Sequence, residues 1–243
     1  MKVVIVYKWA RDGANAAVRA DGTVDWRGAK MAAGEDDPAA LAVAKRLAED
    51  TGGTVVGLTI GDGDASWALA RGVGEAYSVT DVPPFADNAA TARVIAAAVE
   101  RIGDVDVVVV GDSKQDPGVA PAVAGHLGWT ALAGLASASV VDGRVAAVRR
   151  SATEEQTISV APPVLLGVAA EADVDTMPGM KELLAARKRP LTTWPLADIG
   201  DPGTDVRSTG TRKPDAVAAT LFDGDPATSA AQFVAALRAD GVL

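Results

Sequence analysis

The run Val105-Asp-Val-Val-Val-Val110 is followed directly by Gly111-Asp-Ser-Lys-Gln-Asp-Pro-Gly-Val-Ala-Pro121. A short β-branched run of this kind is typical of a strand that is buried on both faces of a parallel sheet. The residues from Ala122 to Leu127 then have the composition of a short helix. The segment therefore predicts a strand, a glycine-containing loop and a helix in immediate succession.

Three other runs have the same character, and helical stretches separate them. The apolar runs are Lys2-Val-Val-Ile-Val-Tyr7, Thr54–Ile60 and Ala76–Val79. Pro38–Asp50 and Asn88–Ile102 carry their apolar residues at helical spacing. Strands that alternate with helices of ~10–15 residues predict βαβ units and hence an α/β fold with a parallel sheet.

Two segments interrupt this alternation and predict appended antiparallel hairpins. Ala17–Trp26 alternates around an Asp-Gly turn at residues 21 and 22. Ser137–Leu166 contains a second Asp-Gly turn at residues 142 and 143, and Gln156–Val160 is a further alternating run. After a Pro-Pro pair, Val164–Val168 is again continuously apolar and predicts another strand.

The composition changes after Trp194, which predicts a nucleotide-binding α/β domain over 1–195 and a C-terminal arm over 196–243. Pro178–Arg187 predicts a short helix whose end carries the basic residues Arg187, Lys188 and Arg189. Pro226–Ala239 predicts a final amphipathic helix with Asp225 as N-cap. One helix after a polar linker is too small for a domain, so the arm is expected to dock on a partner subunit.

Composition excludes several classes of function. The 243 residues carry 23 Lys+Arg against 32 Asp+Glu, a net charge of −9, which argues against general binding of nucleic acid. There is no cysteine, and His126 is the one histidine, which excludes thiolate chemistry and multi-histidine metal sites. No apolar run reaches the ~18 residues of a membrane span. We therefore expect a cytoplasmic protein.

The loop after Val110 is the strongest candidate for a binding site. Ligands of open parallel sheets bind outside the carboxyl ends of the strands. Gly111 and Gly118 allow a close approach of the backbone, and the helix start offers N–H groups to a phosphate. Three side chains add donors: Ser113, Lys114 and Gln115. The alternative is an ordinary βα turn, because the spacing matches neither a Walker loop nor G-x-G-x-x-G.

Other strand ends offer weaker candidates. Lys8 follows the first strand and is suited to a phosphate or simply to solvent. The acidic residues of Gly61–Asp64 suit a ribose hydroxyl or a metal, although a turn and a helix cap explain them as well. Gly34–Pro38 is typical of a helix start.

The order of these segments resembles the β subunit of electron transfer flavoproteins from Lys2 to about Gly200. The shared features include the strand end Val6-Tyr7-Lys8 and the Leu-Gly-Trp element at residues 127–129. They also include the basic, acidic and apolar order from Arg150 to Leu166, and the segment Met180–Leu191. The loop Val119-Ala120-Pro121 is similar to relatives that hold a second nucleotide.

The resemblance implies an adenine-nucleotide-alpha-hydrolase-like, Rossmann-like sheet and an electron carrier subunit rather than an enzyme. An α subunit would hold most of the FAD, and this chain would bind AMP or a second FAD. The electrons would come from a flavin dehydrogenase that contacts residues 177–185 and would pass to a downstream acceptor. The implied cofactor-binding residues are Val6, Tyr7, Lys8, Gly34, Glu35, Asp36, Asp37, Ile60, Gly111, Asp112, Ser113, Lys114, Gln115, Asp116, Pro117, Gly118 and Val119.

Two other functions are compatible with a parallel sheet of this kind. One is a stand-alone adenine-nucleotide-binding module like the universal stress proteins, which carry a glycine-rich phosphate loop near the C-terminus. The other is an ATP pyrophosphatase, which carries Ser-Gly-Gly-X-Asp-Ser after the first strand. The segment Lys8-Trp-Ala-Arg-Asp-Gly13 does not match the latter motif.

Overall fold

The structure of the chain is a computed structural model. The structure describes residues 1–61, 66–83, 87–112, 116–169, 178–186, 188–189 and 191–200. In the C-terminal part it describes residues 203–204, 206, 209–210, 212–216 and 218–243.

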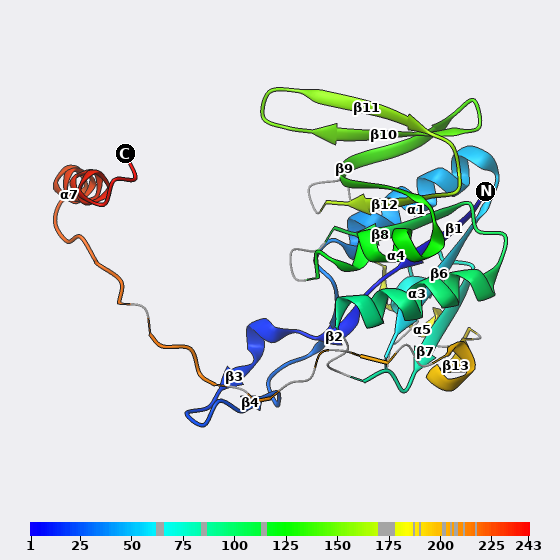
Figure 1. The fold of residues 1–243 in the computed structure, drawn as a ribbon, viewed down its shortest axis with the longest axis horizontal. Helices are drawn as coiled ribbons and strands as arrows, with labels where there is room; N and C mark the ends of the chain where they lie inside the picture. The colour runs from blue at the N-terminus through cyan, green and yellow to red at the C-terminus, as the bar shows by residue number, and fades with distance from the viewer. Residues whose placement is uncertain are drawn as a thin grey trace. The chain divides into compact units, whose positions relative to one another are not determined.

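A nine-stranded sheet forms the centre of the fold, in the order β11-β10-β9-β12-β8-β1-β6-β7-β13 (Figure 1). The strands from β12 to β13 are all parallel, whereas β10 and β11 are antiparallel to their neighbours. The strands are β1 (Lys2–Val6), β6 (Thr54–Ile60), β7 (Glu75–Thr80), β8 (Val107–Gly111), β9 (Thr130–Val141), β10 (Arg144–Arg150), β11 (Glu155–Val160), β12 (Val164–Val168) and β13 (Thr192–Pro195). The fold is therefore α/β and Rossmann-like, with appended antiparallel hairpins, as the alternation of segments predicts.

Strand β9 joins the parallel and antiparallel parts of the sheet. Its first half runs parallel to β12, with Thr130 opposite Val164. Its second half is antiparallel to β10, with Val140 opposite Val145. The sequence predicts a strand only from Ser137, because the exposed first residues of β9 do not alternate in polarity.

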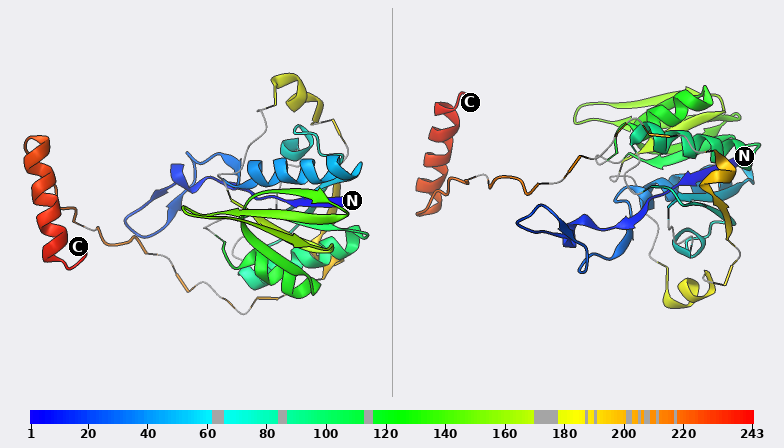
Figure 2. Two further views of the ribbon diagram at one scale, coloured as in Figure 1. Left: turned by 90° about the horizontal axis from the view of Figure 1, so that it is seen from above. Right: turned by 60° about the horizontal axis from the view of Figure 1, so that its bottom comes forward.

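Helices cover both faces of the sheet, as Figure 2 shows. On one face, α1 (Asp37–Thr51) packs over β1, β8 and β9. On the other face lie α3 (Asn88–Ile102) and α4 (Val119–Leu127). Alternate residues of β1 enter the two cores: Val3 and Ile5 pack on the α1 side, and Val4 and Val6 on the other.

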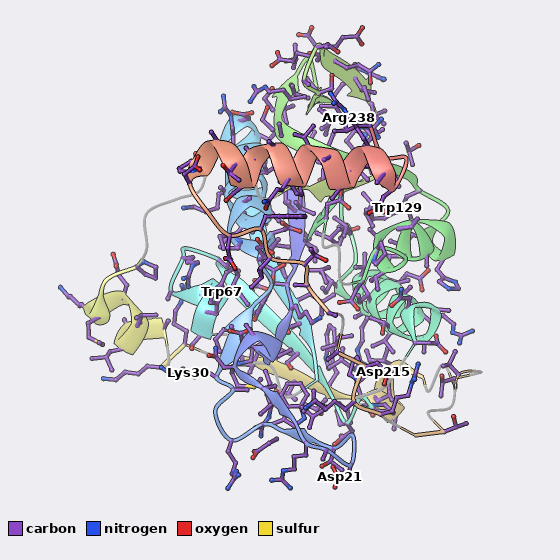
Figure 3. All side chains as sticks on the ribbon, turned by 90° about the vertical axis from the view of Figure 1, so that its left-hand side faces the viewer. Asp21, Lys30, Trp67, Trp129, Asp215 and Arg238 are labelled. Carbon is purple, nitrogen blue, oxygen red and sulfur yellow. The ribbon has the colours of Figure 1, made fainter. Side chains whose placement is uncertain are left out.

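The aromatic side chains follow the same division. Trp67, on the short helix α2 (Ser66–Leu69), packs in the α1-side core, and Trp129 packs against the opposite core. Figure 3 shows these two side chains on opposite sides of the strands. Each fully buried Val or Leu of these cores contributes about 1.5–3 kcal/mol to folding, so the two cores carry most of the stability.

Smaller elements are not part of the nine-stranded sheet. β2 (Trp9–Arg11) pairs with β5 (Met31–Ala33), and β3 (Ala17–Val18) pairs with β4 (Val24–Asp25) around the predicted Asp21-Gly22 turn. A 3-10 turn (Gly13–Asn15), α5 (Met180–Ala186) and α6 (Leu196–Ile199) complete this part. The sequence predicts neither the β2–β5 pair nor β13, because each strand is only three or four residues long.

The chain divides into two compact units. The first comprises residues 1–17 and 25–210, and the second comprises residues 18–24 and 211–243. In the second unit, α7 (Pro226–Ala239) has the predicted bounds, and the Asp225 carboxylate accepts hydrogen bonds from the backbone N–H groups of Ala227 and Thr228. No residue of α7 is buried, and Phe233 packs edge-on against Phe222 with 6.0 Å between the ring centres.

None of the helices in the described ranges has the length and apolar character that crossing a membrane requires. The division of the chain after residue 195 stays a prediction.

Candidate functional site

A cleft of about 770 Å³ lies at the carboxyl ends of β1, β6 and β8. β1 lies between β6 and β8, and the connection through α1 crosses one face of the sheet whereas the connection through α3 crosses the other. This is the topological switch point, where open α/β sheets bind their ligands. The cleft is lined by Val6, Tyr7, Lys8, Trp9, Ala10, Arg11, Met31, Gly34, Asp36, Asp37, Ile60, Gly61, Asp81, Val82, Pro83, Thr91, Ile95, Val110, Gly111, Asp112, Asp116, Pro117, Val119 and Ala120.

Asp37, the first residue of α1, is buried at the floor of this cleft. Its Oδ2 atom accepts hydrogen bonds from the backbone N–H of Lys8 at 2.9 Å and of Gly34 at 2.7 Å. Burial raises the pKa of Asp37 from 3.8 to about 6, against the opposing effect of the two backbone hydrogen bonds. One carboxyl group thus ties the end of β1 to the start of α1.

Two glycines make room for this carboxyl group. A Cβ atom on Gly111 would lie 2.8 Å from Asp36 Cβ and 3.1 Å from Asp37 Oδ1. A Cβ atom on Gly34 would lie 2.9 Å from Asp37 Oδ2. The end of β8 and the start of α1 therefore approach one another more closely than any other residue type allows. Packing within the protein already explains both glycines.

The N-terminus of α4 faces the cleft through Val119 and Ala120. Its N-cap is Gly118, which provides no side-chain cap, and a Cβ atom there would lie 2.9 Å from Asn88 Nδ2. In the first turn, the Val119 N–H donates to the Asp116 carbonyl at 3.1 Å and Pro121 has no N–H, so the Ala120 N–H is the group at this helix start that is suited to a phosphate. Close by, Asp112 accepts a 2.6 Å hydrogen bond from the backbone N–H of Gly134, which holds the start of this loop against β9.

The charged side chains of the described lining are mainly acidic. The carboxylates belong to Asp36, Asp37, Asp81, Asp112 and Asp116, and the cations are Lys8 and Arg11. The Lys8 ammonium lies 2.7 Å from Asp116 Oδ2, and both side chains are about two-fifths exposed, at 43% and 41%. Arg11 donates instead to the backbone carbonyl of Trp26 at 3.3 Å.

The apolar part of the lining can enclose a planar base. Val6, Ile60 and Val110 come from three neighbouring strand ends, and Ile95 and Val119 come from α3 and α4. An apolar wall beside an uncapped helix start and a lysine fits an adenine nucleotide. Among the residues that the structure describes, no three acidic or histidine side chains are grouped so as to bind a metal ion.

A family model for the electron transfer flavoprotein domain matches residues 22–199, which is well over half of the chain. The chain belongs to the electron transfer flavoprotein family. The family match agrees with the resemblance noted in the sequence but does not distinguish the α from the β subunit. The matched range includes every residue of the described cleft lining except residues 6–11.

Most of the residues predicted for a flavoprotein nucleotide site come together in the cleft. Neither Glu35, which is exposed, nor Gly118, which lies against Asn88, is part of the lining. Ser113, Lys114 and Gln115 lie outside the described residues. The predicted residues that line the cleft are Val6, Tyr7, Lys8, Gly34, Asp36, Asp37, Ile60, Gly111, Asp112, Asp116, Pro117 and Val119.

Sequence reasoning missed the contribution of the β7–α3 connection to this cleft. Asp81, Val82 and Pro83 follow β7, and Thr91 and Ile95 lie on α3. The rule that ligands lie beyond the carboxyl ends of parallel strands also applies to the end of β7 and would have indicated Asp81. Its φ of 60° is uncommon for a residue other than glycine.

Proposed function

We propose that this chain is the β-type subunit of a two-chain electron transfer flavoprotein, and that its cleft binds the adenosine phosphate part of AMP or of a second FAD. The observation that carries the proposal is the cleft at the switch point between β1 and β8, with the uncapped start of α4 on one side. The family match supports the electron-transfer role.

Each part of the cleft has a task in this proposal. The apolar side chains of Val6, Ile60 and Ile95 exclude water from the base. The first turn of α4 and the Lys8 ammonium stabilise the phosphate charge. Asp37 holds the backbone of the β1 end in place. A bound flavin supplies the redox chemistry by accepting and passing on electrons, and the chain orients it.

The remaining parts of the chain are proposed to contact partners. Met180 and Leu184 on α5 are exposed at 72% and 53%, which supports a dehydrogenase contact within residues 177–185. In the arm, Leu221 and Phe233 are exposed at 81% and 51%. Exposed large apolar side chains on α7, which buries no residue, and on the segment before it support docking of the arm on an α subunit that holds most of the FAD.

Calorimetric titration of the full chain with AMP, FAD and adenosine tests the cleft. We expect heat with at least one nucleotide, and we expect Ala120→Phe, which places a ring in the cleft, to abolish it. Ala120→Ser is the matched control and should bind normally. The absence of binding by the unaltered chain would contradict the nucleotide site.

Co-expression with the α subunit of an electron transfer flavoprotein tests the subunit role. We expect a stable complex with a flavin absorption spectrum that a flavin dehydrogenase can reduce. A chain that binds nucleotide yet never associates with an α subunit would favour the stand-alone binding module instead.

A further inference from the structure

An ion pair in the cleft lining joins two loops that are far apart in sequence. Lys8 follows β1, and Asp116 precedes α4, yet Lys8 Nζ lies 2.7 Å from Asp116 Oδ2. From this pair we infer that Asp116 sets the affinity of the cleft for phosphate-bearing ligands, because its carboxylate competes with the ligand phosphate for the ammonium group of Lys8. The inference rests on the proposed nucleotide site and adds a residue that tunes its specificity.

Among the described residues, Lys8 is the cation that pairs with a carboxylate beside the start of α4, where a phosphate is proposed to bind. The described lining holds five carboxylates and two cations, and the second cation, Arg11, donates to the Trp26 carbonyl at 3.3 Å. A phosphate that enters so acidic a cleft is repelled unless a cation lies beside it. In the structure, Asp116 already balances the charge of that cation.

The ammonium group of Lys8 can change partner without any change in the backbone. The Lys8 N–H is fixed by the buried carboxyl group of Asp37 at 2.9 Å, which anchors the base of the side chain. The side chain itself is 43% exposed, so its four-carbon stem rotates without displacing core residues. Asp116 is 41% exposed, so water can solvate its carboxylate after the lysine has left.

The strength of the pair permits such an exchange. Breaking a half-exposed ion pair such as Lys8–Asp116 changes the binding constant of a competing ligand by only about two- to fivefold. A phosphate that carries up to two charges and lies at the positive end of the α4 dipole, beside the Ala120 N–H, competes successfully with one carboxylate. Asp116 therefore weakens phosphate binding by a small factor and leaves the binding of an uncharged nucleoside unchanged. The cleft thereby discriminates by ligand charge.

The test uses the full chain, with AMP and adenosine as probes in calorimetry at fixed salt. Asp116→Asn should tighten AMP binding by about two- to fivefold and leave adenosine binding unchanged. Lys8→Met should weaken AMP binding and leave adenosine binding unchanged. In a chain that already carries Lys8→Met, Asp116→Asn should increase AMP affinity by a smaller factor than in the unaltered chain, because Asp116 no longer competes with AMP for Lys8.

Glu155→Gln is the matched control for net charge. Glu155 forms an exposed pair with Arg150 at 3.0 Å and is not part of the cleft lining, so this variant should leave AMP binding unchanged. A gain equal to that of Asp116→Asn would show a general charge effect and overturn the inference. The inference would also be overturned if Asp116→Asn increased AMP affinity by the same factor in chains with and without Lys8→Met.

The two proposals fail in different ways. If the unaltered chain binds AMP or adenosine and Asp116→Asn leaves the preference for AMP unchanged, the role of Asp116 is wrong and the nucleotide site stands. If no adenine ligand binds the unaltered chain, the nucleotide site is wrong and the role of Asp116 falls with it.

Discussion

The carboxyl group of Asp37 accepts the backbone N–H of Lys8 at 2.9 Å and thereby joins the end of β1 to the first turn of α1. The same oxygen accepts the N–H of Gly34, and the end of β8 packs against this group at Gly111. Three segments that border the cleft thus meet at one buried carboxyl group. Because burial raises the pKa of this group, its ionisation state affects the stability of the protein.

Replacement of Asp37 by Asn should remove a pH dependence of stability. Burial raises the pKa of Asp37 from 3.8 to about 6, so the folded protein binds this proton more tightly than the unfolded chain does. The contribution of Asp37 to stability therefore falls as the pH rises through this window and is constant above it. From pH 5 to pH 8 the unaltered chain should lose about 1.5 kcal/mol relative to Asp37→Asn.

Denaturant unfolding of both proteins at the two pH values measures this difference. Comparison with the variant cancels the contribution of exposed carboxyl groups such as Asp87, whose pKa is lowered by its hydrogen bond from Thr204. Parallel stability curves for the two proteins would contradict the assignment to Asp37.

Gly111→Ala should destabilise the protein by about 1–3 kcal/mol. The added Cβ atom would meet Asp36 Cβ at 2.8 Å and the backbone carbon of Asp36 at 3.2 Å, so β8 and α1 must move apart. Gly125→Ala is the matched control, because Gly125 lies within α4 and a Cβ atom there has open space around it. We expect Gly125→Ala to be more stable than the unaltered chain by about 0.5–1 kcal/mol in urea unfolding. If both Gly111→Ala and Gly125→Ala lost stability, the packing explanation would be wrong.

Arg189→Gln should destabilise the protein by about 1 kcal/mol. The Arg189 guanidinium donates to the carbonyls of Leu69 and Val73 at 3.3 and 3.1 Å, and also to that of Gly74. It therefore holds the segment after α5 against the turn between α2 and β7. Lys188→Gln removes the same charge from the neighbouring residue and should have little effect. Equal destabilisation by the two changes, measured by urea unfolding, would indicate a nonspecific charge effect.

Asp225→Ala should loosen α7 without affecting the sheet. The carboxylate caps two backbone N–H groups and also accepts the Thr228 hydroxyl at 2.6 Å. Amide hydrogen exchange over residues 229–239 should become about fivefold faster, which is the usual effect of losing an N-cap. Asp223→Ala, two residues earlier, is the control. Unchanged exchange in α7 would show that the cap does not stabilise the helix.

Local patterns predicted the central part of the fold. The bounds of β6, β12, α3 and α7 agree with those expected from the sequence. These segments have continuous β-branched runs or clear helical spacing, so their own residues determine their structure. The strands of the β2–β5 pair and β13 are too short to carry such a pattern, and pairing with neighbouring strands decides them.

The basic residues after α5 illustrate an interpretation that tertiary structure changes. The sequence predicts that cations such as Arg189 complement the end of their own helix. In the structure Arg189 binds carbonyls of the α2–β7 segment, over a hundred residues earlier in the chain. Any exposed carbonyl group suits a guanidinium, so proximity in space decides the partner.

By itself, the sequence determined that the chain is an α/β protein and predicted that its candidate binding residues follow the strands. It could do so because hydrophobic periodicity and turn residues act over a few neighbouring positions. Only the tertiary structure decided that Asp37 serves the end of β1 rather than capping its own helix, and that Lys8 meets Asp116. Both contacts join residues that are distant in sequence, at 29 and 108 positions apart. The burial that raises the pKa of Asp37 exists only when sheet and helices enclose it.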